Sequence, residues 1–274
     1  MLRIILWVFS TCDIAFVSSL SVNGTPNLAP YSFFNIFSSN PPLAIFSSNT
    51  RVTDGTKKDT LNNCLIGREL VINIVDASIV HKMTVASVEY LPDVDEFVKA
   101  GLTPIPSEKV APYRIEESPA HLECKVMEVK TMGNHPGAAN LVFCEIVLIH
   151  IRENVFMEGK DRVDPDKIKL IGRMGRSYYT HAYGKSIETI YQPILDGAIG
   201  YDQLPDYVKE SNELSALQLT KIAGLPKLPK KAEIIAWRNR NLNNGSLDEL
   251  IDEALNAKDY LSALCGIMSK ELLE

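Results

Sequence analysis

The chain has 274 residues, a formal net charge of -6 and a pI near 5.5. This length suits one large domain or one domain with an extension, and 46% hydrophobic with 23% charged residues is ordinary for a globular protein. Nucleic-acid binding usually needs a basic surface, so we expect no nucleic-acid partner.

The N-terminal segment is apolar and has two interpretations. Residues 1–20 resemble a secretory signal, but Asp13 interrupts the run, Arg3 is its lone early positive charge, and the second half alternates like a strand. The run before Asp13 is too short to cross a bilayer, which takes about 20 residues. We favour a first barrel strand, over residues 13–21, rather than a targeting segment, and we expect no membrane attachment.

The next elements are two strands joined at a hairpin and a proline-containing segment. Asn23-Gly24 suits a tight turn after the first strand. The following strand begins near Asn27 and ends over residues 38–42. Because Pro30 removes a backbone donor, this part is expected at a sheet edge, at a bulge or facing a ligand.

A short buried strand over residues 43–48 leads into a polar loop and a helix. The loop covers residues 49–57, and the helix is predicted over residues 59–67 with Asp59 as its N-terminal cap and Gly67 as its stop signal. Lys57, Lys58 and Thr60 therefore gather at a helix N-terminus.

The middle of the chain alternates strands and short helices. Prolines at 104, 106, 112 and 119 predict a connection with little regular structure. The predicted elements are a strand over 69–75, helices over 78–87 and 92–101, and a hairpin of two long strands over 120–132 and 141–153. About six strands separated by short loops favour an antiparallel barrel over a doubly wound parallel sheet.

Helical periodicity replaces strands in the last quarter of the chain. Helices are predicted over residues 211–223, 231–242 and 246–273, the last beginning at a Ser246 and Glu249 capping box. We place a domain boundary near Gly200, between a domain of residues 1–200 and a helical extension of residues 201–274. The apolar stripes of the extension must cover the barrel, another subunit or a partner.

Cysteine and histidine spacing indicates no metal site. The five cysteines, among them Cys12, are odd in number and form no CxxC pair, and the five histidines are scattered. We interpret the cysteines as buried thiols in a reducing compartment, the cytoplasm.

The segment around the predicted helix start is the clearest candidate site. Backbone N–H groups and the partial positive charge of a helix N-terminus suit a phosphate dianion. Cations and hydroxyls that could complete a phosphate cradle are Arg51, Lys57, Lys58, Ser47, Ser48 and Thr60. The alternative is a solvated loop before an ordinary capped helix. Likewise, the aromatic residues of 29–35 either present a surface for a flat heteroaromatic ligand or fill the barrel core.

Several separated motifs resemble the flavin reductase-like family, the FMN-binding split barrels that include flavoredoxin. The similarity spans roughly residues 14–185. The motifs are, in order, NLAPYSFFN, SSNPPLAIFSSN, KDT with LxN, VDEFVKAGLTPIPS, ESPAHLECKVMEV, LVFCEIVLIHI and DRVDP. The resemblance implies a mainly β fold with inserted helices, an antiparallel split β-barrel, to which this chain adds an α-helical C-terminal extension.

The resemblance also implies FMN as cofactor and assigns residues to it. The isoalloxazine would lie in a groove at a homodimer interface, lined by Pro30, Tyr31, Ser32, Phe33 and Asn35, and Asn27 and Ala29 are assigned to the cofactor as well. The ribityl chain and phosphate would be approached by Ser47, Ser48, Asn49 and Arg51, and closed over by Lys58, Asp59 and Thr60. Asp59 is expected to cap the helix and organise Lys58, because two anions repel.

Two departures from the family pattern bear on function. Family reductases have a Gly-Asp-His loop for the nicotinamide nucleotide, whereas this chain has Gly133-Asn134-His135 and a longer loop. His135 is thus a candidate nicotinamide contact or part of an ordinary surface hairpin. The Pro-Arg-Pro that precedes the first strand in the family is replaced near residues 11–13.

The resemblance implies an oxidoreductase in which flavin performs the chemistry, so no catalytic side chain is assigned. The first hypothesis is an NAD(P)H-dependent flavin reductase that passes a hydride to flavin N5. The second is a flavoredoxin-like electron carrier that receives electrons from a protein partner, which the altered loop favours. The third is a non-catalytic FMN-binding interaction protein.

Overall fold

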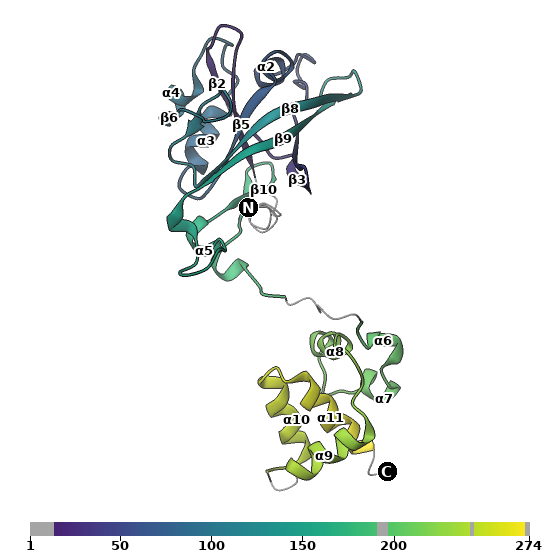
Figure 1. Cartoon of the computed structure of the whole chain (residues 1–274). Helices are drawn as coiled ribbons and strands as arrows, with labels where there is room; N and C mark the ends of the chain where they lie inside the picture. Colours follow the sequence, from purple (N-terminus) through teal and green to yellow (C-terminus); the bar gives the residue numbers. More distant parts are fainter. Residues whose placement is uncertain (1–13, 191–196, 242–243, 272–274) are drawn as a thin grey trace. The chain divides into compact units, whose positions relative to one another are not determined.

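The computed structural model describes residues 14–190, 197–241 and 244–271. The chain forms two compact units, Met1–Glu188 and Thr189–Glu274 (Figure 1). The division lies before the boundary that the sequence analysis placed near Gly200. The expectation for residues 1–13 falls outside the described part, whereas the strand expected over 13–21 is present from Ala15 to Leu20.

The first unit is built on one seven-stranded antiparallel sheet, in the order β2-β1-β5-β8-β9-β4-β3. Its strands are β1 (Ala15–Leu20), β2 (Pro26–Tyr31), β3 (Phe34–Ser39), β4 (Pro42–Ser47), β5 (Glu69–Ile74), β8 (Ala120–Met132) and β9 (Ala139–Ile151). Two small hairpins accompany it, β6 (Pro104–Ile105) with β7 (Arg114–Ile115) and β10 (Ile171–Gly175) with β11 (Tyr178–His181). The hairpin of β10 and β11 was not predicted.

The sheet curls because its two edge strands are neighbours along the chain. β2 and β3 lie at opposite edges, yet only Ser32 and Phe33 separate them. Three Cα–Cα steps of about 3.8 Å cannot reach across a flat seven-stranded sheet, so the edges must approach each other. The predicted antiparallel split barrel is therefore confirmed.

The strand predicted to contain Pro30 is in fact two strands. The sequence analysis expected one strand from Asn27 to the region of 38–42, but the structure has β2 and β3, with a bend at Ser32 and Phe33. The placement of Pro30 at a sheet edge is confirmed, since β2 pairs with β1 on one side only. A missing N–H is tolerated on an edge strand.

Short helices cover the sheet on both sides. The helices are α2 (Asp59–Gly67), α3 (Val80–Ala86), α4 (Glu96–Ala100) and α5 (Pro165–Ile168), with 3₁₀ turns η1 (Glu153–Val155) and η2 (Gly184–Ser186). One apolar cluster fills the inside of the barrel and includes Phe46, Leu61 and Ile72. A second packs α3 and α4 against the outer side through Phe16, Leu28 and Phe97.

Residues 104–119, the proline-rich strap, are held by side chains of the sheet rather than by their own secondary structure. Glu123 accepts from the backbone N–H groups of Glu108 at 2.9 Å and Lys109 at 2.6 Å, and Asn73 accepts from that of Ile115 at 2.9 Å. These bonds satisfy backbone groups for which the prolines leave few regular partners. The sparse structure predicted for this region is thereby confirmed.

His121 lies beneath the strap and is expected to make the fold acid-sensitive. Burial lowers the pKa of His121 to about 4, although its bond to the Ile115 carbonyl acts the other way. The folded state therefore binds fewer protons than the unfolded state below pH 6.5, and stability falls as pH drops from 6.5 towards 4, by up to about 3 kcal/mol.

The pH dependence of urea unfolding tests this expectation. His121→Gln keeps a side-chain N–H for the Ile115 carbonyl but removes the titrating ring, so the difference in unfolding free energy between pH 7 and pH 4.5 should shrink by about 2 kcal/mol. Equal pH dependence in the parent protein and in His121→Gln would show that other titrating groups cause the acid sensitivity.

The second unit is a small helical bundle. Its helices are α6 (Gly200–Gln203), α7 (Asp206–Lys209), α8 (Ala216–Ala223), α9 (Lys231–Asn241), α10 (Leu247–Asn256) and α11 (Tyr260–Glu271). The helix predicted over 246–273 is two helices, because Lys258 turns the chain with a φ of 60°. Gly266 lets α11 approach its neighbours, since a Cβ there would lie 2.6 Å from Ile251 Cγ1. The capping box of Ser246 and Glu249 is present.

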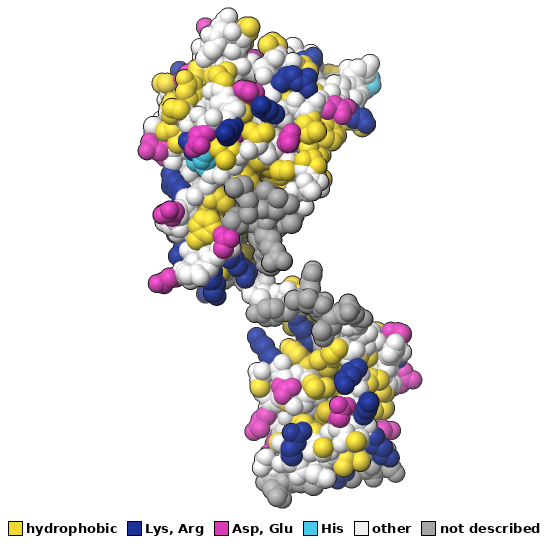
Figure 2. Space-filling model, viewed as in Figure 1, with side chains coloured by type: hydrophobic (Ala, Val, Ile, Leu, Met, Phe, Trp, Pro, Cys, Tyr) yellow, Lys and Arg dark blue, Asp and Glu magenta, His cyan; other side chains and the backbone are white. Residues whose placement is uncertain are grey.

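The structure shows where the charged side chains and the cysteines lie. On the face shown in Figure 2, acidic and basic side chains are interspersed. Within the described ranges, no helix is long and apolar enough to cross a membrane, and no cluster of metal-ligating side chains is found. Cys64, Cys124, Cys144 and Cys265 are buried free thiols, as expected, and Cys12 lies outside the described residues.

Candidate functional site

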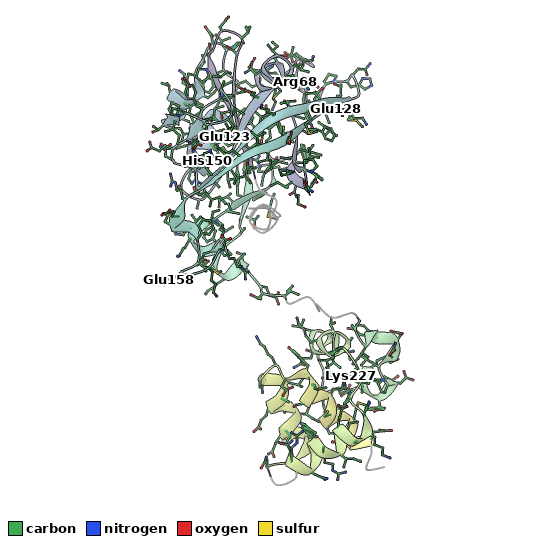
Figure 3. All side chains as sticks on the ribbon, in the orientation of Figure 1. Arg68, Glu123, Glu128, His150, Glu158 and Lys227 are labelled. Carbon is green, nitrogen blue, oxygen red and sulfur yellow. The ribbon has the colours of Figure 1, made fainter. Side chains whose placement is uncertain are left out.

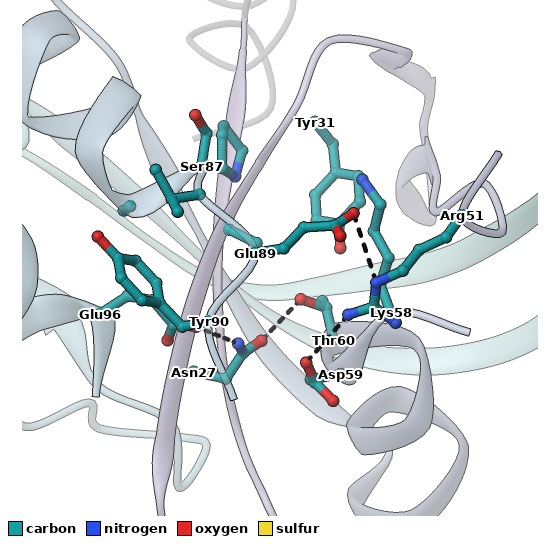
Figure 4. Close-up of a pocket in the computed structure, with 14 residues that line it drawn as sticks. Asn27, Tyr31, Arg51, Lys58, Asp59, Thr60, Ser87, Glu89, Tyr90 and Glu96 are labelled. Carbon is teal, nitrogen blue, oxygen red and sulfur yellow. Dashed lines mark hydrogen bonds and ion pairs between the residues drawn. The ribbon is translucent and has the colours of Figure 1, made fainter. Parts of the chain in front are cut away.

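A pocket opens where the edge strand β2 meets the N-terminus of α2 (Figure 4). Of the residues predicted to bind a cofactor, those that line it are Asn27, Ala29, Pro30, Tyr31, Arg51, Lys58, Asp59 and Thr60. The tertiary fold thus brings the proline-containing strand and the basic helix start to opposite sides of one cavity. Its volume is about 150 Å³.

Tyr31 forms the apolar wall of the pocket. Its side chain is 4% exposed, and its ring packs on Phe46 with centroids 5.0 Å apart. Burial raises the pKa of Tyr31 to about 12, so the phenol stays neutral at physiological pH. The hydroxyl accepts a hydrogen bond from Ser48 at 3.4 Å. The Tyr31 ring therefore fills the core and also borders the cavity, and its role in holding a heteroaromatic ligand remains a prediction.

Lys58 supplies a cation that forms no ion pair with the other residues that the structure describes. Its ammonium lies 5.5 Å from the centre of the Tyr31 ring, and the ion pairs found among the described residues do not include it. Burial lowers the pKa of Lys58, and the charge of Glu89 partly offsets that effect. A partly desolvated ammonium without an ion pair is a favourable place for an anion, because an added negative charge there restores the lost stabilisation.

Arg51 reaches the same pocket from the loop before α2. Its guanidinium lies 3.5 Å from Asp59 and 3.4 Å from Glu89, and it donates to the Lys57 carbonyl at 2.6 Å. The side chain is thus held by its own loop while it faces the cavity. This arrangement corrects the expected role of Asp59. The N-cap position is Lys58, without a side-chain bond, and Asp59 pairs with Arg51 instead.

A buried hydrogen-bond chain organises the polar floor. Thr60 donates to Asn27 at 2.7 Å, and Asn27 donates to Glu96 at 3.1 Å. Glu96 also accepts from the backbone N–H of Leu28 at 2.9 Å. Burial raises the pKa of Glu96, and these donors act against that effect. The chain fixes the Thr60 side chain relative to β2, and it commits the hydroxyl hydrogen of Thr60 to Asn27.

The other predicted binding residues lie outside the lining of the cavity. Phe33 is 70% exposed at the bend between β2 and β3, next to Ser32, and the Asn35 side chain accepts from the Ile36 N–H. Ser47 donates to Asn49 at 2.6 Å below the loop. The proposed roles of these residues remain predictions.

The hairpin that carries His135 packs against the pocket loop. The Thr50 hydroxyl donates to the His135 carbonyl at 3.3 Å, and the Thr50 N–H donates to the Ala138 carbonyl at 3.0 Å. The His135 side chain is exposed. The structure therefore places the candidate nicotinamide loop beside the loop of Arg51, although the two are far apart in sequence.

The sequence analysis missed one wall of the pocket. The missed lining residues come from the end of α3, the loop after it and the start of α4, namely Ala86, Ser87, Val88, Glu89, Tyr90 and Glu96. Glu96 carried no distinct signal, since the same predicted helix also contains Asp93, Asp95 and Lys99. Glu89 carried none, because its role depends only on where the loop folds.

The chain is similar to proteins of known sequence and structure. A model of the flavin reductase like domain matches residues 11–165. An uncharacterized protein of Aquifex aeolicus is 35% identical over 183 residues, which are 67% of this chain and 90% of that protein.

Among solved structures, component B of nitrilotriacetate monooxygenase from Bacillus cereus superposes with a TM-score of 0.59 at 31% identity, over 65% of this chain and 86% of that one. The 2-nitrobenzoate 2-nitroreductase NbaA of Pseudomonas fluorescens gives a TM-score of 0.58 at 29% identity, over 70% and 90%.

Proposed function

The chain belongs to the flavin reductase like domain family, and from that premise we propose that it binds FMN and reduces it with a hydride from NADH or NADPH. The observation that carries the proposal is the pocket at the start of α2, where Arg51 lies beside Lys58, which is in no ion pair within the described part of the chain. Two cations and a helix N-terminus together suit the dianionic phosphate of a mononucleotide.

The pocket fits the phosphate end of FMN rather than the whole molecule. Sites that bury a drug-sized ligand have volumes of roughly 300–1,000 Å³, whereas this cavity holds about 150 Å³. In the proposal, Lys58, Arg51 and the backbone N–H of Thr60 in the first turn of α2 hold the phosphate, and the isoalloxazine lies outside the cavity along β2 and the exposed Phe33. A ring in that position needs a cover, and in the proposed homodimer the second copy of the chain supplies it.

A bound flavin would supply the redox chemistry, accepting a hydride at N5 and passing electrons onward. The chain's own groups position it. Tyr31 is neutral and buried, so it borders the site without exchanging a proton. His135, on the hairpin beside the Arg51 loop, is the proposed contact for the nicotinamide nucleotide. No side-chain acid or base is needed for hydride transfer, and we assign none.

The similar solved proteins support a redox role. The Bacillus cereus protein is named as a component of a monooxygenase, and the Pseudomonas fluorescens protein as a nitroreductase. We propose by extension that this chain hands electrons from flavin to an acceptor, either a partner protein or a small molecule. The free thiols of the described residues support the cytoplasm, a reducing compartment, as its location.

An absorption spectrum of the purified protein tests the function. We expect a yellow protein after FMN is added and gel-filtered, and we expect NADH or NADPH to bleach the flavin band without air. A protein that stays yellow with both nucleotides contradicts the reductase proposal.

The second candidate function is a flavoredoxin-like carrier. Asn134 stands where the family reductases have Asp, and the longer hairpin packs on the pocket loop through Pro136, 3.6 Å from a Cβ built at Gly55. In that case FMN would stay bound, NADH and NADPH would leave it oxidised, and a protein reductant would reduce it. Failure to bind FMN under any condition would favour a non-catalytic interaction protein.

A further inference from the structure

Glu89 is the one pocket-lining carboxylate that reaches across the cavity from the loop after α3. Its Oε1 lies 3.4 Å from Arg51 Nε, and its charge also acts on Lys58. Figure 4 shows its side chain extending from that loop towards the side of the pocket formed by Arg51 and Lys58. The same two cations are those assigned to the flavin phosphate.

The Glu89 contact is easily broken, unlike the contact of Asp59. The Glu89 side chain is 64% exposed, whereas that of Asp59 is 24% exposed and fixed in the first turn of α2. An exposed ion pair contributes little because water stabilises both partners when they separate. Glu89 can therefore rotate into solvent at low cost, and Arg51 stays in place through Asp59 and the Lys57 carbonyl.

The loop backbone beside Glu89 is anchored. The Tyr90 hydroxyl donates to the Val85 carbonyl at 3.2 Å, and the Lys99 ammonium lies 5.7 Å from the centre of the Tyr90 ring. These contacts hold the Glu89 backbone next to the cavity, so its carboxylate stays at a high local concentration near the two cations.

We propose that Glu89 is an internal counter-ion that competes with the flavin phosphate for Arg51 and Lys58, and thereby sets how readily FMN leaves the protein. This inference rests on the proposed function. When FMN enters, the phosphate replaces the carboxylate; when FMN leaves, the carboxylate restores charge balance. The carboxylate re-forms its ion pair as the phosphate departs, which lowers the barrier to release and shortens the residence time of a mononucleotide.

Titration of FMN and riboflavin into the full chain with Glu89→Gln tests the proposal. The amide keeps the size of the side chain but not its charge, so the Kd for FMN should fall about two- to fivefold, and dissociation should slow by a similar factor. Riboflavin lacks the phosphate, so its Kd should not change. The FMN difference should shrink at high salt, since the cations and the carboxylate are partly exposed.

Asp93→Asn is the matched control. Asp93 is exposed, lies on the same loop between α3 and α4 and does not line the pocket, and its substitution alters net charge equally. Unchanged FMN affinity in Glu89→Gln overturns the proposal, and so does an equal gain for riboflavin or for Asp93→Asn. If the unsubstituted protein binds FMN no better than riboflavin, the proposed phosphate site itself fails. If FMN binds better than riboflavin but Glu89→Gln leaves its Kd unchanged, the phosphate site stands and only the counter-ion proposal fails.

Discussion

Lys58→Ala is expected to weaken FMN binding by about 10- to 100-fold. The ammonium has no carboxylate partner among the described residues and is partly buried, so a phosphate would be its main counter-charge. A hydrogen bond to a charged group contributes about 1.5–3 kcal/mol, which corresponds to that range of Kd. Quenching of flavin fluorescence on titration measures the loss.

Two controls make the Lys58 experiment specific. Riboflavin should bind Lys58→Ala and the parent protein nearly equally, because it presents no phosphate. Lys57→Ala removes the same charge from the neighbouring, exposed residue, which does not line the pocket, and should change FMN binding little. Thermal melting should be almost unchanged in both variants, since the contact of Lys58 with the Tyr31 ring is worth about 0.5–1 kcal/mol. Equal FMN affinity in Lys58→Ala would contradict the phosphate site.

Glu123→Ala is expected to destabilise the first unit by about 3–5 kcal/mol. The carboxylate is fully buried and accepts from two backbone N–H groups of the strap and from His150 at 2.7 Å. Burial raises the pKa of Glu123, but those donors and the His150 charge outweigh it and hold the pKa below its usual range. Removal of the carboxylate leaves these partly buried donors without their acceptor and leaves a gap where the buried side chain was.

Urea unfolding measures the loss, and hydrogen exchange locates it. The strap should exchange faster in Glu123→Ala, because Glu108 and Lys109 lose their acceptor. Glu128, on the same strand, is exposed, and Figure 3 labels both glutamates with His150. Glu128→Ala should therefore change stability by no more than about 0.5 kcal/mol. A Glu123→Ala protein as stable as Glu128→Ala would show that the strap is held by other contacts.

The long strands were predictable because their pattern is local. The strand predicted over 120–132 is β8, and the other strand of the hairpin is β9, shifted by two residues. The start of the helix at Asp59 was also predicted. The identity of its cap was wrong, because Arg51 comes from outside the helix and competes for the Asp59 carboxylate. Short elements such as β10 and β11 leave too few residues for a periodic signal.

By itself, the sequence determined that this protein has an antiparallel β domain followed by helices, and that a basic helix start and a proline-containing aromatic strand are its two distinctive segments. Only the tertiary structure decided that these segments face one cavity, that Asn27 and Thr60 are joined through a hydrogen bond, and that Glu89 lies opposite Arg51. The physical reason is the sequence separation over which each kind of interaction acts. Periodicity and capping act within a few residues, whereas the pocket arises where a curled sheet, a helix N-terminus and a distant loop meet.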